Sequence, residues 1–279
     1  YLKYKMEGFN VQEFKKGTSN AETYTLSFWV KSNVTGTGQV NMRDETNNRM
    51  CSATYTTDVA DTWEKKVLNF AADTSGASAC TKAEALAIEW MVAAGTDYTS
   101  GTAPTAWETI AATDRAAAVT LALSGSTDND FSITGVQLEV GTYTSTTIPP
   151  FQFESFGDNL ARCQRYYLNY ADVFTDNGPP LFSCQKYNAT VWYANMPFPV
   201  NLRTTPTVIS PTVSSGYRIY TNGGTVEYDQ IDLINANTTN SGSTNCRLQL
   251  DGATGGTAGE SGFTKGNAAG VGLAFEAEL

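Results

Sequence analysis

The chain has 279 residues, a formal net charge of −10, and hydrophobic residues over 41% of its length. This hydrophobic fraction suffices for packed cores, and no run approaches the roughly 18 apolar residues of a transmembrane helix, so we expect a soluble globular protein without membrane insertion. Acidic residues outnumber basic ones in both halves of the chain, which disfavours nucleic acids and anionic membranes as partners.

The first half of the sequence reads as a series of β-strands. Abundant threonine, glycine and aromatic residues favour strands and tight turns, so the predicted class is all-β. Residues 22–32 alternate apolar side chains, such as Leu26 and Phe28, with a second face that carries Trp29. Six further strands are predicted at 38–43, 50–57, 63–71, 85–93, 117–123 and 130–140. Seven strands at this spacing predict a β-sandwich or jelly roll.

A long connection and a junction interrupt these strands. Residues 95–119 are rich in Ala and Thr, and a short helix fits within 106–117. Two prolines at 149 and 150 then end the first predicted domain, residues 1–150. After them, "FGDNLARCQRYY" places Leu160, Cys163 and Tyr167 at helical spacing. We expect a short helical turn here, packed against a sandwich through Leu160 and Cys163.

The second half, residues 151–279, reads as another, smaller β-domain. The complete prediction is therefore two tandem β-sandwich or jelly-roll-like domains joined by a short helical turn. Residues 235–245 and 252–262 are polar and rich in small residues, so we expect them to form exposed loops. Predicted strands in this half lie at 163–170, 180–187, 189–198, 205–211, 216–221, 225–234, 246–252 and 270–279.

Catalytic and metal chemistry is restricted by the absence of histidine. No reaction that needs imidazole as a base or ligand is open to the chain, and five cysteines without a CxxC pair make zinc improbable. An odd cysteine count fits buried free thiols at least as well as a disulfide between Cys51 and Cys80. A carboxylate pair of the glycosidase kind stays open, but the acids cluster in turn motifs, so we expect no enzyme.

Two kinds of binding residue remain as candidates. Asp128 and Asp130 lie in an oxygen-rich turn that is either a calcium site or an ordinary hydrated hairpin, and no other cofactor is predicted. Sugars pack their apolar faces on aromatic rings. The tryptophans within strand patterns, Trp63, Trp90 and Trp192, are expected in cores. The glycan-binding candidates are the loop aromatics Tyr98, Trp107 and Tyr143.

Four segments in fixed order carry a family resemblance: "LSFWVKS", "DTWEKKVLNFAADTSG", "FSITGVQLEVG" and "FESFGDNLARCQRYY". Together they resemble tail-fibre or receptor-binding-type virion proteins of marine tailed phages, and the resemblance spans most of residues 5–170. In that family a carbohydrate-binding-module-like jelly roll precedes this type of junction, and a small β-domain follows it. Glu154 departs from the family pattern, in which Arg or His is more usual nearby.

The resemblance implies a non-enzymatic virion protein of the tail fibre or another appendage, on the surface of the extracellular particle. Its expected partners are other virion proteins, further copies of itself in a homotrimer, and host cell-surface polysaccharide. Two alternatives stay open: a carbohydrate-binding module of a secreted polysaccharide-active enzyme, and a purely structural or decoration protein without a ligand. Because residue 1 is not Met, we expect the chain to be a piece of a longer product, with early jelly-roll strands missing.

Overall fold

The computed structural model of the protein describes residues 1–174, 180–209, 217–221, 226–231, 233–236, 241–251, 256–266 and 271–278. Strands dominate these residues, and α1 (Phe156–Gln164) is the one α-helix among them, which confirms the all-β class. The chain forms two compact units, Tyr1–Gln152 and Phe153–Glu278. In this described part of the chain, no helix has the length and apolar character that crossing a membrane requires.

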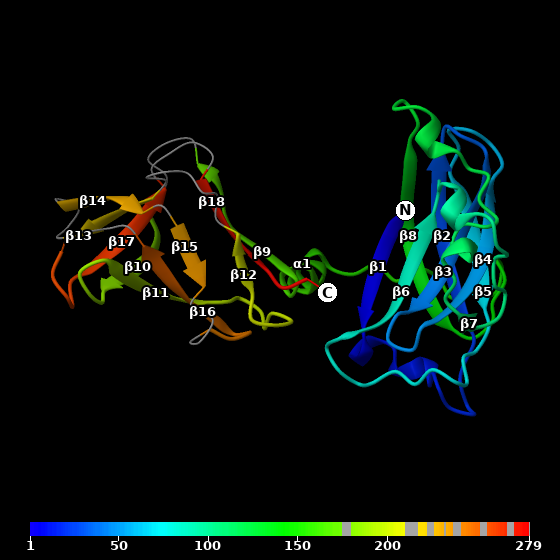
Figure 1. Cartoon of the computed structure of the whole chain (residues 1–279), viewed down its shortest axis with the longest axis horizontal. Coiled ribbons are helices and arrows are strands. Elements are labelled where there is room, and N and C mark those ends of the chain that lie inside the picture. The colour runs from blue at the N-terminus through cyan, green and yellow to red at the C-terminus, as the bar shows by residue number, and fades with distance from the viewer. Residues whose placement is uncertain are drawn as a thin grey trace. The chain divides into compact units, whose positions relative to one another are not determined.

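Unit 1 is a sandwich of two antiparallel sheets (Figure 1). The five-stranded sheet has the order β1 (Leu2–Glu7), β6 (Glu84–Met91), β3 (Gly36–Asp44), β4 (Arg49–Thr57), β7 (Glu108–Thr109). The three-stranded sheet has the order β5 (Glu64–Phe70), β2 (Tyr24–Ser32), β8 (Phe131–Val140). One hydrophobic core joins side chains from both sheets, as expected when each sheet buries one face.

The alternation in β2 builds much of this core. Leu26 and Phe28 are fully buried, whereas Trp29 on the opposite face is exposed, as the sequence pattern predicts. Phe28 meets Trp90 of the other sheet edge to face, with ring centroids 5.9 Å apart and an interplanar angle of 90°. Such edge-to-face pairs add to the stabilisation that burial provides.

Of the seven strands predicted in the first half, six are confirmed as β2, β3, β4, β5, β6 and β8. The strand predicted at 117–123 is wrong, because Thr120 and Leu121 both donate their backbone N–H to the carbonyl of Thr37 at 2.9 Å instead of joining a ladder. The helix predicted within 106–117 is replaced by β7 and a 3-10 turn at Ala112–Asp114.

The long connection after β6 covers the outer face of the five-stranded sheet. Gln39 Nε2 donates to the carbonyl of Asp114 at 2.9 Å, and Asn41 Nδ2 donates to the carbonyl of Arg115 at 2.8 Å. Both amide side chains are buried, and they donate to backbone carbonyls that would otherwise be buried without a hydrogen-bond partner. The connection is therefore an integral layer of unit 1.

Unit 2 contains a seven-stranded and a three-stranded antiparallel sheet. The first has the order β14 (Val226–Ile231), β13 (Tyr217–Thr221), β17 (Ser261–Gly266), β10 (Pro180–Lys186), β11 (Val191–Pro197), β16 (Asn245–Asp251), β15 (Leu233–Ala236). The second has the order β12 (Thr207–Ile209), β18 (Val271–Glu276), β9 (Tyr167–Phe174). Trp192, Leu248 and Phe275 belong to a second core that joins the two sheets. Parts of the predicted strands and loops at 210–211, 216, 225, 232, 237–240, 252–255, 270 and 279 lie outside the described residues.

The helix after the two prolines is longer than the single turn expected from the sequence. Ser155 caps it, because its Oγ accepts the backbone N–H of Asp158 at 3.2 Å. No residue of α1 is buried: Leu160 is 41% exposed, and Cys163 is exposed as well. The prediction that Leu160 and Cys163 pack against a sandwich is therefore wrong, since their shared face is accessible to solvent.

Candidate functional site

Trp107, one of the three predicted glycan-binding residues, lies in the core of unit 1. Its side chain is 9% exposed, and its indole Nε1 donates to the carbonyl of Ala71 at 2.7 Å. The Lys16 ammonium lies 4.9 Å from the centre of the indole. The interpretation of Trp107 as an exposed loop aromatic is wrong, because the long connection folds back against the sandwich and buries it.

Tyr98 and Tyr143 lie in two different loops of unit 1. Tyr98 is exposed, and the guanidinium of Arg115 lies 5.4 Å from its ring centre. Tyr143 is half-buried, and its backbone N–H donates to Thr25 Oγ1 at 3.0 Å. No ring contact joins Tyr98, Trp107 and Tyr143 among the residues that the structure describes. The structure does not bring the three candidates together as one binding surface.

The turn with Asp128 and Asp130 is tied to the end of β2 by hydrogen bonds. Asn33 donates its backbone N–H to Asp130 Oδ1 at 3.0 Å and its side-chain Nδ2 to the carbonyl of Asp128 at 3.0 Å. One carboxylate oxygen of Asp130 is therefore already used to tie this turn to the end of β2. Within the described ranges, no group of three or more Cys, Asp and Glu residues is placed to hold a metal ion.

The remaining cysteine and tryptophan predictions have mixed outcomes. All five cysteines are free thiols, with Cys51 buried and Cys80 exposed. Trp90 and Trp192 lie in the cores, as predicted. Trp63 does not: it is 43% exposed at the start of β5, with the Lys31 ammonium 5.9 Å from its ring centre. Trp63 directly precedes β5 and is not part of its ladder, which the apolar pattern of the predicted strand does not reveal.

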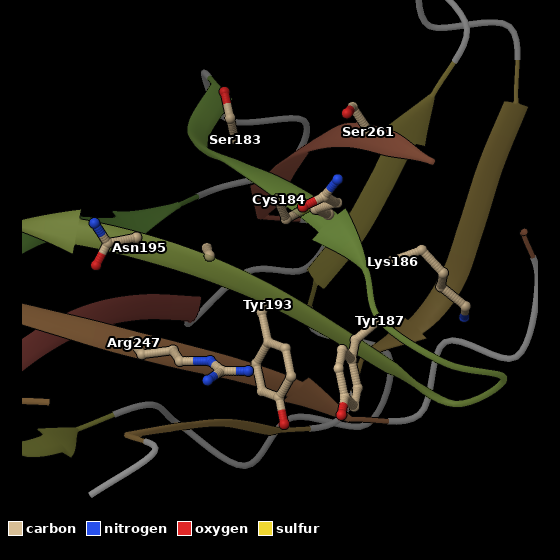
Figure 2. A pocket seen from close by; sticks show the side chains of 10 residues that line it. Ser183, Cys184, Lys186, Tyr187, Tyr193, Asn195, Arg247 and Ser261 are labelled. Atoms are coloured by element: carbon tan, nitrogen blue, oxygen red, sulfur yellow. The ribbon is translucent and has the colours of Figure 1, made fainter. Parts of the chain in front are cut away.

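An open groove on unit 2 collects a set of side chains that the sequence did not single out (Figure 2). Its volume is about 700 Å³. The groove is lined by Ser183, Cys184, Gln185, Lys186, Tyr187, Tyr193, Ala194, Asn195, Arg247 and Ser261. These residues belong to β10, β11, β16 and β17, or directly follow β10, so the seven-stranded sheet positions nearly all of them.

The groove follows from how β10 and β11 pair. The two strands pair only at Gln185 with Tyr193 and at Lys186 with Trp192, within ranges that the structure describes completely. By contrast, β11 pairs with β16 along its whole length. The hairpin between β10 and β11 is held by Asn188, whose Oδ1 accepts the backbone N–H of Thr190 and of Val191, both at 3.0 Å. Beyond the hairpin the strands are no longer paired, which leaves the groove.

Strand alternation divides the groove residues between the core and the solvent. On β11, Trp192 and Ala194 are buried while Tyr193 and Asn195 face outward. The rings of Tyr187 and Tyr193 have centroids 5.1 Å apart at 55°, and Tyr187 is 62% exposed. The Arg247 guanidinium lies 3.7 Å from the centre of the Tyr193 ring (Figure 2). One ring is thus held by a cation while the other is open to a ligand.

The electrostatics of the groove differ from those of the chain as a whole. The described residues that line it include Lys186 and Arg247 and no carboxylate. Desolvation lowers the pKa of Lys186, whose ammonium lies 5.1 Å from the Trp192 ring centre, although Glu260 acts in the opposite direction. Burial raises the pKa of Cys184 to about 11. Its thiol therefore stays protonated at neutral pH, which makes it a poor nucleophile.

Sequence reasoning missed this site because it sought ligand-binding aromatics in loops. Tyr193 lies inside a strand, where an aromatic residue is ordinarily assigned to a core. Arg247 lies inside a neighbouring strand, away from the loops that were searched. The available signal was the alternation of "VWYANM", in which Tyr193 and Asn195 must share the face opposite Trp192.

The groove offers two tyrosine rings, side-chain amides, serine hydroxyls and a guanidinium around an open space. These groups can stack on a ring-shaped ligand and form hydrogen bonds with its hydroxyl groups. No protein-family model matches the chain, and no curated protein is significantly similar to it.

Proposed function

We propose that the protein binds saccharides at the groove of unit 2, and that it does so as an adhesion protein of a phage tail fibre or another virion appendage. The observation that carries this proposal is the arrangement of Tyr187, Tyr193 and Arg247 on the solvent-facing side of a sheet. The sequence resemblance supports the virion context, and the groove supports the ligand class.

The two tyrosines provide what a sugar ring needs. The apolar face of a pyranose packs on an aromatic face, and the exposed ring of Tyr187 offers such a face without having to move. Arg247 stacks on Tyr193 and so restricts its rotation, which lowers the entropy lost when a ligand binds. Gln185 and Asn195 are exposed beside the rings and can form hydrogen bonds with sugar hydroxyls.

An open groove suits adhesion better than tight capture. Part of any ligand stays in water, so each site binds weakly, and many copies on one particle supply the overall strength. The proposal assigns the groove no catalytic role, because the residues described along its lining do not include the carboxylate pair on which most glycosidases depend.

The proposal is tested by saccharide binding of the full chain. The biotinylated protein, displayed on streptavidin to restore multivalency, is applied to an array of bacterial polysaccharides and to extracted host polysaccharide. Tyr187→Ala should abolish binding without changing the melting temperature. Tyr4→Ala, at a 58% exposed tyrosine of unit 1, is the matched control and should bind like the wild type. A wild-type multimer that binds no saccharide would refute the ligand class.

The virion context needs a separate measurement. Mass spectrometry of purified particles should find the chain in fixed proportion to the other virion proteins. Its absence from particles, together with saccharide binding by the isolated chain, would instead favour a module of a secreted polysaccharide-active protein.

A further inference from the structure

We infer that the saccharide bound at the groove is acidic, and that Arg247 binds the carboxylate of a uronic-acid unit whose neighbouring ring stacks on Tyr187. This inference rests on the proposed function and narrows its ligand to one chemical class.

The first observation is that Arg247 has no anionic partner in the described part of the chain. Its backbone is anchored by Ser241, whose Oγ accepts the Arg247 N–H at 2.9 Å. Among the residues that the structure describes, its guanidinium contacts the Tyr193 ring and forms neither an ion pair nor a hydrogen bond. A guanidinium carries five N–H donors in a planar fork that matches a carboxylate. The stacked face is used by Tyr193, and the donor edges remain for a ligand.

The second observation is the local sign of charge. The chain carries a net charge of −10, yet the described residues that line the groove include Arg247 and no carboxylate. An acidic protein repels anions in general, so an anion binds only where fixed cations outweigh that repulsion. A neutral saccharide would gain only hydrogen bonds from the Arg247 guanidinium, whereas an acidic one would gain hydrogen bonds together with the attraction between opposite charges.

The third observation is the order of the groups. The Tyr193 ring lies between Arg247 and Tyr187, 3.7 Å from the guanidinium and 5.1 Å from the second ring (Figure 2). A sugar on Tyr187 therefore reaches Arg247 across a single aromatic ring. This spacing fits an oligosaccharide that stacks one unit and presents a carboxylate from the next.

A single guanidinium also argues against a nucleic acid. Phosphate backbones are bound by several lysines and arginines along one face, and the lining, as far as the structure describes it, contains two basic residues, of which Lys186 is buried. An isolated carboxylate next to a sugar ring is the better match to a single donor fork.

The experiment compares matched pairs of saccharides. Oligomers of polygalacturonate, polymannuronate and glucuronan are titrated calorimetrically into the full chain, each beside its carboxyl-reduced form, which keeps the sugar ring and removes the charge. The wild type should bind at least one acidic form about tenfold more tightly than its reduced partner, as expected for a charge-assisted hydrogen bond. The preference should weaken between about 50 mM and about 500 mM NaCl as the charges are screened.

Two arginine variants assign the preference to one residue. Arg247→Gln should erase the difference between acidic and reduced forms, and Arg247→Lys should keep part of it, because the charge remains while the fork is lost. Arg162→Gln, at an exposed arginine of α1, removes the same charge elsewhere and should behave like the wild type. An unchanged melting temperature shows that each variant is folded.

The possible failures separate the two proposals. Equal binding of acidic and reduced forms, or a preference that persists in Arg247→Gln, overturns the inference and leaves saccharide binding intact. The inference is also overturned, and saccharide binding is kept, if neutral saccharides on the array bind through Tyr187 while no acidic oligomer binds. If neither the array nor the matched pairs show binding, both the inference and the proposed function are wrong.

Discussion

The Lys16 ammonium lies 2.8 Å from Asp73 Oδ2, and both side chains are buried in unit 1. Lys16 also donates to Asp44 Oδ2 and, at 2.7 Å, to the carbonyl of Gly76. One cation is thus surrounded by oxygen atoms beside the ring of Trp107. Buried charges persist only when they are paired and hydrogen-bonded in this way.

Replacing Lys16 by Met should therefore destabilise unit 1 strongly. Two buried carboxylates would lose their shared cation, and removing one partner of a buried ion pair costs about 3–5 kcal/mol. Urea denaturation of the full chain, followed by tryptophan fluorescence, measures this loss. Lys15→Met is the control, because Lys15 forms an exposed pair with Glu22, and such pairs contribute about 1 kcal/mol at most. Equal effects of the two variants would contradict the buried pair.

The same ion pair predicts a loss of stability in acid. Burial alone would raise the pKa of the Asp73 carboxyl, but hydrogen bonds from Arg49 and Lys16 outweigh it and hold that pKa below its usual value. A carboxyl with a lowered folded pKa stabilises the fold above the unfolded pKa of about 3.9, and this contribution disappears as the pH falls through the folded pKa.

The free energy of unfolding should accordingly decline as the pH falls below about 4. In Asp73→Asn, unfolding at pH 7 should require less urea, and the further decline in acid should be smaller than in the wild type. An identical acid decline in both proteins would show that Asp73 does not contribute to it.

Trp107 and Trp63 should respond to alanine in the opposite order to that expected from their sequence positions. Trp107→Ala removes a buried indole and its hydrogen bond to Ala71, and such a change costs about 3–5 kcal/mol. Trp63→Ala removes a half-exposed side chain and should cost about 1 kcal/mol or less. Thermal unfolding of the two variants side by side decides between the two orders.

A comparison of β2 with Trp107 and Arg247 shows which features local sequence patterns determine and which they do not. The alternation of Leu26, Phe28 and Trp29 depends on neighbours in one strand, so it predicted β2 and its buried face. Trp107 is buried because its connection returns to Ala71, a contact between segments 36 residues apart. Arg247 reaches Tyr193 only through the pairing of β11 with β16. Long-range pairing of this kind leaves no periodic signal in either segment.

In helix α1, the sequence correctly predicted the helical spacing of Leu160 and Cys163, but the prediction that these two side chains are buried was wrong. Leu160 is 41% exposed, so Leu160→Asp should change the stability of the chain by only about 0.5 kcal/mol. Differential scanning calorimetry should show nearly the same melting temperature for the variant and the wild type. A drop of many degrees would mean that the apolar face of α1 is covered in solution.

The five cysteines should divide into two reactive and three protected thiols. Cys80 and Cys163 are exposed, whereas Cys51, Cys184 and Cys246 are buried. Burial raises the pKa of all three buried thiols, to about 11 for Cys184. Because the thiolate is the reactive form, these groups react slowly even where a reagent reaches them.

Ellman's reagent at pH 8 should therefore modify two thiols rapidly in the native protein and all five after denaturation. The variant with Cys80→Ser and Cys163→Ser should lose the rapid phase and retain three thiols on unfolding. A disulfide between Cys51 and Cys80 would instead leave one rapid thiol, Cys163, and three in the denatured wild type, so the count separates free from bridged cysteines. Rapid modification of a third thiol in the native state would mean that a buried cysteine, with Cys184 in the groove the first to examine, becomes accessible in solution.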